Sequence, residues 1–348
     1  MTLLWSYPII AAPMAGGVST PALAAAVSNA GGLGFLAAGY KTEAALRAEI
    51  EAVRGLTNAP VGVNLFVPGS EEADEAGLER YRVRMNSEAQ RLQVQPGEAL
   101  YDDDEWEGKL RVVRELRVPV VSFTFGCPSK GVLMELKGLG TTVVVTVTSL
   151  EEALLSVEAG ADALCAQGVE AGGHRASFGN RMPDREALSL LVLLRQVRQA
   201  VSVPLIAAGG LMHGGDVAAV LSAGAEAAQL GTAFLLCPES GTHPVHRAAL
   251  TDGRFTETAL TRAFTGRRAR GLVNRFLAEH ADAPAAYPQI QHLTRPIRKA
   301  SGDLGEADAM SLWAGQGYKL ARELPAGELI GVLVREAREA LASTAGRL

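Results

Sequence analysis

Short apolar runs alternate with amphipathic stretches along most of the chain. Most of the runs are rich in Val, Ile or Leu and show no polar alternation, which is typical of strands buried on both faces. The stretches between them carry helix-start signals, as where Thr20 precedes Pro21 and where Ser149 stands three residues before Glu152. The pattern therefore predicts eight strand–helix units. Their apolar runs begin at Tyr7, Gly32, Pro60, Val118, Thr141, Ala161, Val203 and Ala227.

Eight such units over about 230 residues indicate the α/β class and favour a (β/α)8 TIM barrel, which typically takes about 250 residues. A doubly wound open sheet is the alternative. Two segments break the repeat, an acidic one after the third strand and a long one after the eighth. We expect residues 1–68, 118–236 and 324–348 to form the barrel. We expect residues 69–117 and 237–323 to form a smaller, mainly helical domain that covers the substrate at one rim.

Composition narrows the class of partner. The 348 residues carry a formal net charge of −5, which argues against binding to nucleic acid or to an anionic membrane. No uncharged apolar run reaches the ~20 residues of a membrane span, and the start "MTLLWSYPII" lacks a signal-peptide pattern. Cys127, Cys165 and Cys237 stand far apart, which fits a reducing compartment and gives no metal motif. We expect a cytoplasmic monomer or homodimer that binds small molecules and no metal.

Two glycine-bearing loops follow the seventh and eighth predicted strands. They read "AAGGLMHGGD", which includes Gly209 and Gly210, and "QLGTAF", which includes Gly231 and Thr232. In this fold a phosphate is usually held here by backbone N–H groups and a helix N-terminus. The alternative is that the glycines only make tight turns. Two such loops in this order favour phosphate, and the hydroxyl of Thr232 is a further donor.

The stretch "AQGVEAGGHR" follows the sixth predicted strand and holds the main catalytic candidate, His174. A histidine titrates near neutral pH and suits a general acid or base, and the glycines before it let the backbone pass close to a planar ligand. Asn64 and Gln167 are amides at strand ends, where they bond either loop backbone or a flat heterocycle such as a flavin. Glu170 either orients the imidazole or caps the loop, and Arg175 is expected to be structural.

The ordered set of motifs resembles a known family. The stretches "PIIAAPMAGGVSTPALAAAVSNAGGLGFL", "VNLF", "VSFTFGCP", "AQGVEAGGHR", "PLIAAGGLMHGGD", "AAQLGTAFLLCPES" and "LWAGQG" are similar to those of the class I nitronate monooxygenases, formerly called 2-nitropropane dioxygenases. The resemblance covers the barrel almost from end to end. It implies an FMN-binding barrel that oxidises alkyl nitronates, such as propionate 3-nitronate, with O₂ to a carbonyl compound and nitrite. Detoxification is the role that this activity implies.

The resemblance also implies roles for particular residues. His174 matches the family's active-site histidine, which either deprotonates a neutral nitroalkane or, when protonated, holds the anion. Phe125, Tyr287 and Lys319 are candidates to line the substrate pocket. Predicted FMN contacts, from the resemblance and from position at strand ends, are Pro13, Met14, Asn64, Gln167, Gly172, Gly173, Gly209, Gly210, Gln229, Leu230, Gly231 and Thr232.

Two other functions remain open from the sequence. One is an FMN-dependent NAD(P)H reductase of enoyl-acyl-carrier-protein or quinone substrates on the same scaffold, since flavin-type enoyl reductases carry a similar "EAGGH" stretch. The other, from a different class, is a flavin-binding module without turnover. A reductase needs a nicotinamide donor, whereas oxidation of a nitronate needs none.

Overall fold

The eight predicted strands form one closed parallel barrel in the computed structural model, which describes residues 5–69, 73–180 and 187–345. Hydrogen-bonded neighbours follow the order β1-β9-β8-β6-β5-β4-β3-β2, and a parallel bridge between Ile10 and Leu33 joins β1 to β2. This closure confirms the TIM barrel over the open sheet. The strands are β1 Ile9–Ala11, β2 Gly34–Ala37, β3 Val61–Phe66, β4 Val120–Thr124, β5 Thr142–Val147, β6 Ala163–Gln167, β8 Leu205–Ala208 and β9 Ala227–Leu230.

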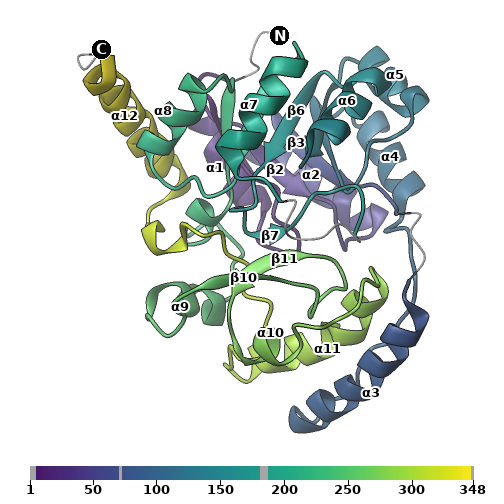
Figure 1. The fold of residues 1–348 in the computed structure, drawn as a ribbon. Helices are drawn as coiled ribbons and strands as arrows, with labels where there is room; N and C mark the ends of the chain where they lie inside the picture. The colour runs from purple at the N-terminus through teal and green to yellow at the C-terminus, as the bar shows by residue number, and fades with distance from the viewer. Residues whose placement is uncertain (1–4, 70–72, 181–186, 346–348) are drawn as a thin grey trace.

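Helices surround the barrel on its outside (Figure 1). Their starts follow the predicted signals, because Thr20 accepts the N–H of Leu23 and Ser149 accepts the N–H of Glu152. The last helix packs against α8 and α1, so the C-terminal stretch returns to the barrel wall as expected. The helices of the wall are α1 Pro21–Asn29, α2 Glu43–Leu56, α4 Trp106–Glu115, α5 Lys130–Gly138, α6 Leu150–Ala159, α7 Leu190–Ala200, α8 Gly214–Ser222 and α12 Ala326–Ala345.

A smaller domain, which we call the cap, covers one end of the barrel (Figure 1). It contains helices and a three-stranded antiparallel sheet of order β10-β11-β7. Because we expected a mainly helical domain, this sheet was not predicted. The two insertions meet there, because Tyr81 and Met85 of α3 lie in one apolar cluster with Phe264, Phe276 and Ile290. The cap elements are α3 Glu75–Arg91, α9 Pro244–Thr251, β10 Thr258–Thr261, β11 Ala269–Leu272, α10 Arg275–Glu279 and α11 Gln289–Asp303, with β7 Gly173–His174 contributed from the barrel.

Helix α4 lies within residues 69–117, which we expected in the cap, but it packs on the barrel. It contacts α2 and β3, and Leu110, Val112 and Val113 share an apolar cluster with Leu46 and Ile50 of α2. The acidic residues before this helix made the whole segment look like a polar insertion, so its amphipathic helix was not recognised from the sequence. We therefore propose that the first insertion ends before Trp106.

A buried ion pair ties the start of α4 to the barrel rim. The ammonium of Lys109, 1% exposed, lies 2.7 Å from a carboxylate oxygen of Asp104, whose other oxygen accepts the N–H of Tyr40. We expect Asp104→Asn to lower the free energy of unfolding by about 3–5 kcal/mol, because the charge of Lys109 would stay buried without its partner. Urea titration measures this change. The matched control is Asp303→Asn, in the exposed pair with Lys299. For this variant we expect the free energy of unfolding to fall by at most about 0.5 kcal/mol. Equal falls in the two variants would show that burial of the Lys109–Asp104 pair does not matter.

None of the helices in the described part of the chain combines the length and the apolar character that crossing a bilayer requires.

Candidate active site

His174 stands where the barrel and the cap join. It forms β7 with Gly173 and pairs with Ala269 of β11, so the loop after β6 becomes the third strand of the cap sheet. The side chain of Gln167 holds this loop: Nε2 donates to the carbonyl of His174 (3.0 Å), and Oε1 accepts the N–H of Ala176 (3.0 Å). The predicted amide at the strand end therefore fixes the backbone of the predicted catalytic histidine.

The glycines before His174 allow a close approach of two loops. A Cβ on Gly172 would lie 2.6 Å from the carbonyl carbon of Ala314, so only glycine fits against the "LWAGQG" segment. Gly173 has a φ of +72°, in the left-handed region. Glu170 accepts the N–H of Leu190 through both oxygens (3.0 and 3.1 Å) and so caps α7. Of the two roles considered for Glu170, the structural one is observed.

Aromatic side chains surround the imidazole of His174. Its ring centroid lies 5.7 Å from that of Phe125, 6.0 Å from that of Tyr287 and 5.6 Å from that of Trp313. Phe125 adopts a φ of +77°, which is uncommon for a bulky residue and is held here by packing against Phe66, with ring centroids 4.5 Å apart. Two of the three predicted substrate-pocket residues, Phe125 and Tyr287, thus meet at His174.

Charge and burial set the protonation of His174. Burial, with smaller contributions from the charges of Arg267 and Arg298, lowers the pKa of the imidazole from 6.5 to about 3. The guanidinium carbon of Arg267 lies 4.0 Å from the ring centroid of Phe125, in a cation–π contact. The imidazole is therefore neutral at neutral pH, which argues against the role, left open by the sequence, of a protonated His174 that holds the anion.

This lowered pKa has a consequence for stability. The unfolded chain binds a proton on His174 below about pH 6.5 and the folded chain only below about pH 3, so stability falls as the pH drops through this interval. We expect the free energy of unfolding, from urea titrations, to fall more between about pH 7 and about pH 5 for the unmodified protein than for His174→Gln. The comparison separates His174 from His246, whose pKa burial also lowers, to about 4. Equal falls would show that His174 keeps an ordinary pKa.

The glycine loops after β8 and β9 converge with the "LWAGQG" segment. Gly209 and Gly210 have φ values of +127° and +71°. The hydroxyl oxygen of Thr232 accepts the N–H of Gly315 (2.9 Å), and a Cβ on Gly317 would lie 2.9 Å from the carbonyl oxygen of Gly210. Backbone from three segments therefore gathers at this edge of the barrel.

Helix α8, which follows Gly210, has its N-terminal amides already bonded. Asp216 accepts the N–H groups of Met212 and His213 (2.9 Å each), and Glu336 accepts that of Gly214 (2.9 Å). His213 caps the helix by accepting the N–H of Gly215 (3.0 Å). The start of α8 is thus not an open anion site, and donors to a phosphate would come from the glycine loops and Thr232.

Strand register shows which predicted contacts face inward. Gln229 lies level with Ile10 and Ala208, both in the apolar cluster of the barrel interior, whereas Leu230 packs outward among the wall helices. Only the backbone of Leu230 is therefore open to a ligand in the barrel. The amide nitrogen of Asn64 is engaged by β4, within 2.9 Å of the hydroxyls of Ser122 and Thr124.

The remaining predicted residues divide by location. Met14 lies beside the second glycine loop, its sulfur 3.7 Å from where a Cβ on Gly231 would lie, and Pro13 precedes it. Lys319 is exposed on the short helix Tyr318–Leu320, with its ammonium 5.9 Å from the ring centroid of Tyr318. No described contact brings Lys319 to His174. Arg175 is buried and donates to the carbonyls of Gln167 and Gly168, so it is structural as expected.

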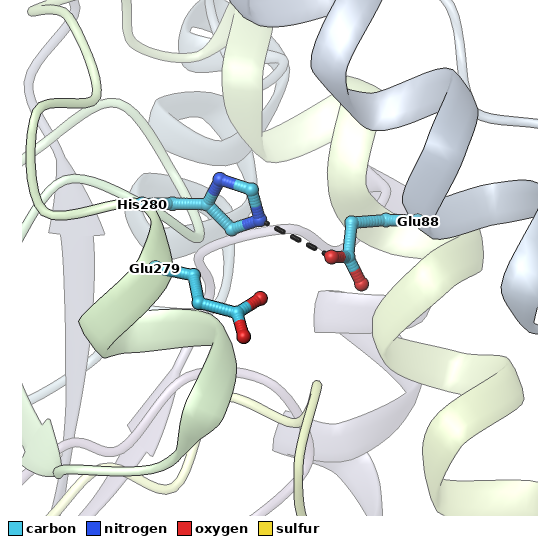
Figure 2. Close-up of side chains that lie close together, drawn as sticks. All are labelled: Glu88, Glu279 and His280. Atoms are coloured by element: carbon cyan, nitrogen blue, oxygen red, sulfur yellow. Dashed lines mark ion pairs between the residues drawn. The ribbon is translucent and has the colours of Figure 1, made fainter.

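A second polar cluster lies within the cap. Figure 2 shows the imidazole of His280 directed at Glu88, with the carboxylate of Glu279 nearby, and their ligand atoms lie within 4.8 Å of one another. Arg275 donates to both oxygens of Glu88 (2.8 and 2.7 Å) and also bonds Glu279. Hydrogen bonds from His280 and Arg275 lower the pKa of Glu88 to about 2. Because a guanidinium already neutralises the carboxylates, the cluster is an ion network joining α3 to α10, and it opposes a bound cation.

The fold and the site define a class: a barrel enzyme of the flavin-dependent oxidoreductases, with a histidine under a cap. Residues 1–336 match the model of the family described as "Nitronate monooxygenase". The chain belongs to this family.

Relatives and solved structures agree with that assignment. The chain is 39% identical over 336 residues to a probable nitronate monooxygenase of Bacillus subtilis, covering 94% of this chain and 95% of the relative. A structure of nitroalkane oxidase from Streptomyces ansochromogenes superposes with a TM-score of 0.96 at 53% identity, covering 98% of each chain. FabK from Thermotoga maritima superposes with a TM-score of 0.74 at 30% identity, covering 99% of this chain and 97% of that one.

Proposed function

We propose that this enzyme uses FMN and O₂ to oxidise alkyl nitronates, such as propionate 3-nitronate, to a carbonyl compound and nitrite, in a detoxifying role. One observation carries the proposal: the neutral imidazole of His174 lies among aromatic rings, within the electrostatic influence of Arg267 and Arg298. The guanidinium of Arg298 bonds neutral groups, Gln291 and Thr294 among them, and no described carboxylate. Its charge is therefore available to attract an anion such as a nitronate.

The residues present fit FMN. At one edge, the loops that hold Gly210 and Gly231, together with the hydroxyl of Thr232, offer donors for a phosphate. Towards the barrel mouth, the inward-facing amide of Gln229 makes no hydrogen bond to another described residue, although it is only partly exposed. A partly buried amide of this kind suits the donor and acceptor edge of a flavin ring.

The residues around the proposed flavin site would have separate roles. Bound FMN would supply the electron acceptor for the nitronate, with O₂ as the final oxidant. Phe125, Tyr287 and Trp313 exclude water and pack against the substrate. Arg267 and Arg298 favour the anion, and neutral His174 removes the proton next to the nitro group when the substrate is a neutral nitroalkane.

The test is direct. The purified protein should be yellow with bound FMN, and propionate 3-nitronate added without oxygen should bleach the flavin. In air the same mixture should consume O₂ and release nitrite. A colourless folded protein that does not take up added FMN would refute the proposal.

The same assay distinguishes a nitronate-oxidising enzyme from an NAD(P)H-dependent reductase. The second possibility is tested because the chain is 30% identical to FabK. Bleaching by NADH or NADPH alone, with no response to the nitronate, would establish a reductase instead. Bound FMN that responds to neither reagent would favour a flavin-binding module without turnover.

A further inference from the structure

Thr265, a cap residue that sequence reasoning did not single out, contacts the catalytic candidate directly. Its side chain is 1% exposed. The hydroxyl oxygen lies 2.9 Å from Nε2 of His174, 3.0 Å from the carbonyl oxygen of Arg267 and 3.2 Å from the amide nitrogen of Arg267. Three polar atoms therefore share one buried hydroxyl.

The number of protons fixes the direction of these bonds. A hydroxyl donates one proton and accepts two, and the N–H of Arg267 takes one of the accepting positions. If Thr265 donates to the carbonyl of Arg267, Nε2–H of His174 fills the second accepting position and three hydrogen bonds form. If Thr265 donates to Nε2 instead, its contact with that carbonyl has no proton, and only two bonds form. In a buried setting the arrangement with more bonds is favoured.

We propose that Thr265 is a positioning residue that holds His174 in the tautomer with a proton on Nε2, so that Nδ1 is the basic atom. Nδ1 makes no hydrogen bond to another described residue. The inference rests on the proposed function for its chemistry. Nδ1 takes the proton from the carbon next to the nitro group, and the electron pair of that C–H bond moves into the nitro group to give the nitronate. The imidazolium keeps its bond to Thr265 and later releases the Nδ1 proton to water.

This arrangement couples the cap to the base. Thr265 comes from the cap and His174 from the loop after β6, and the two segments are also joined through the pairing of His174 with Ala269. The partner that selects the tautomer is thus supplied by the domain that covers the site. A base with the wrong tautomer loses most of its function even when its position is kept.

The experiment uses the FMN-bound protein, ¹⁵N-labelled at histidine, with the His174 signals assigned by their loss in His174→Asn. In the unmodified protein we expect Nε2 protonated and Nδ1 unprotonated. Thr265→Val should give a mixture of tautomers and lower turnover of a neutral nitroalkane by about 10-fold, which is a part of the 10²- to 10⁴-fold that a positioned base contributes in full. Turnover of the preformed nitronate should change by no more than about twofold, because no proton is removed.

Two variants sharpen the result. Thr265→Ser keeps the hydroxyl and should restore the single tautomer and the nitroalkane activity. Thr261→Val removes another buried threonine hydroxyl of the cap and should leave the tautomer and the nitroalkane activity unchanged.

A proton on Nδ1 in the unmodified protein, or an unchanged tautomer and activity in Thr265→Val, would overturn the inference. If Thr265→Val does not fold, the tautomer of the unmodified protein and of Thr265→Ser still decides it. A defined tautomer in a protein that oxidises neither substrate would refute the proposed function alone.

Discussion

Replacing His174 with alanine should lower turnover of neutral nitroalkanes by about 10²-fold or more while FMN stays bound. The imidazole is neutral and lies among aromatic rings; Thr265 bonds its Nε2, and Gln167 holds the backbone carbonyl of His174. These features suit a base that removes a proton from carbon. Oxidation of a preformed nitronate omits that step and should fall much less. Initial rates of O₂ uptake with each substrate, at equal flavin concentration, measure the difference.

The matched control is His243→Ala. His243 is exposed at the start of α9, where it caps the helix by accepting the N–H of Val245, and its loss should change either rate by no more than about twofold. Equal rates for unmodified protein and His174→Ala with a neutral nitroalkane would remove His174 from the mechanism. Equal losses with both substrates would instead indicate that His174 binds the anion.

The barrel was predictable because its physical cause is local. A parallel strand covered on both faces needs a short apolar run, and most of the eight runs have this form. Helix α4 was expected in the cap because the acidic stretch "YDDDEWEG" looks like a solvated loop, but the helix packs on the barrel. Its burial depends on Leu110 and Val113 meeting α2, which is a contact between distant segments.

Within the candidate site, the glycines were predictable because the backbone conformation at their positions demands that residue type. Gly172, Gly173, Gly209 and Gly210 occupy close approaches or left-handed positions, so glycine itself is the signal. Thr265 lies 91 residues from His174 in the chain, and no local pattern indicates such a partner.

The same limit applies to the interior amides and to the cap arginines. Gln167 has the residue type of a ligand contact, yet its amide is engaged by the loop that holds His174. Only the folded chain distinguishes that use from a contact with a ligand. Burial, and to a smaller extent the charges of the cap residues Arg267 and Arg298, lowers the pKa of His174, and no spacing in the sequence encodes this environment.

Replacing Gly172 with alanine should lower turnover of both substrates by about 10²-fold, because a misplacement of about 1 Å near reacting groups has effects of that size. The added Cβ would overlap the carbonyl carbon of Ala314 at 2.6 Å, and the amide of Gly315 lies closer still. Both are backbone atoms, so the loop carrying His174 or the "LWAGQG" segment must shift. The segment would then be displaced from Thr232 and Gly210, and FMN binding should weaken as well.

Flavin content after gel filtration and rates at saturating FMN separate the two effects. The control is Gly331→Ala in α12, where a Cβ meets no atom within 4 Å and alanine is the better helix former, by about 1 kcal/mol. That variant should keep full flavin content and activity. If Gly172→Ala binds FMN and turns over like the unmodified protein, the two loops do not need to touch for the site to form. The close approach would then be a feature of packing and not a requirement of the cofactor site.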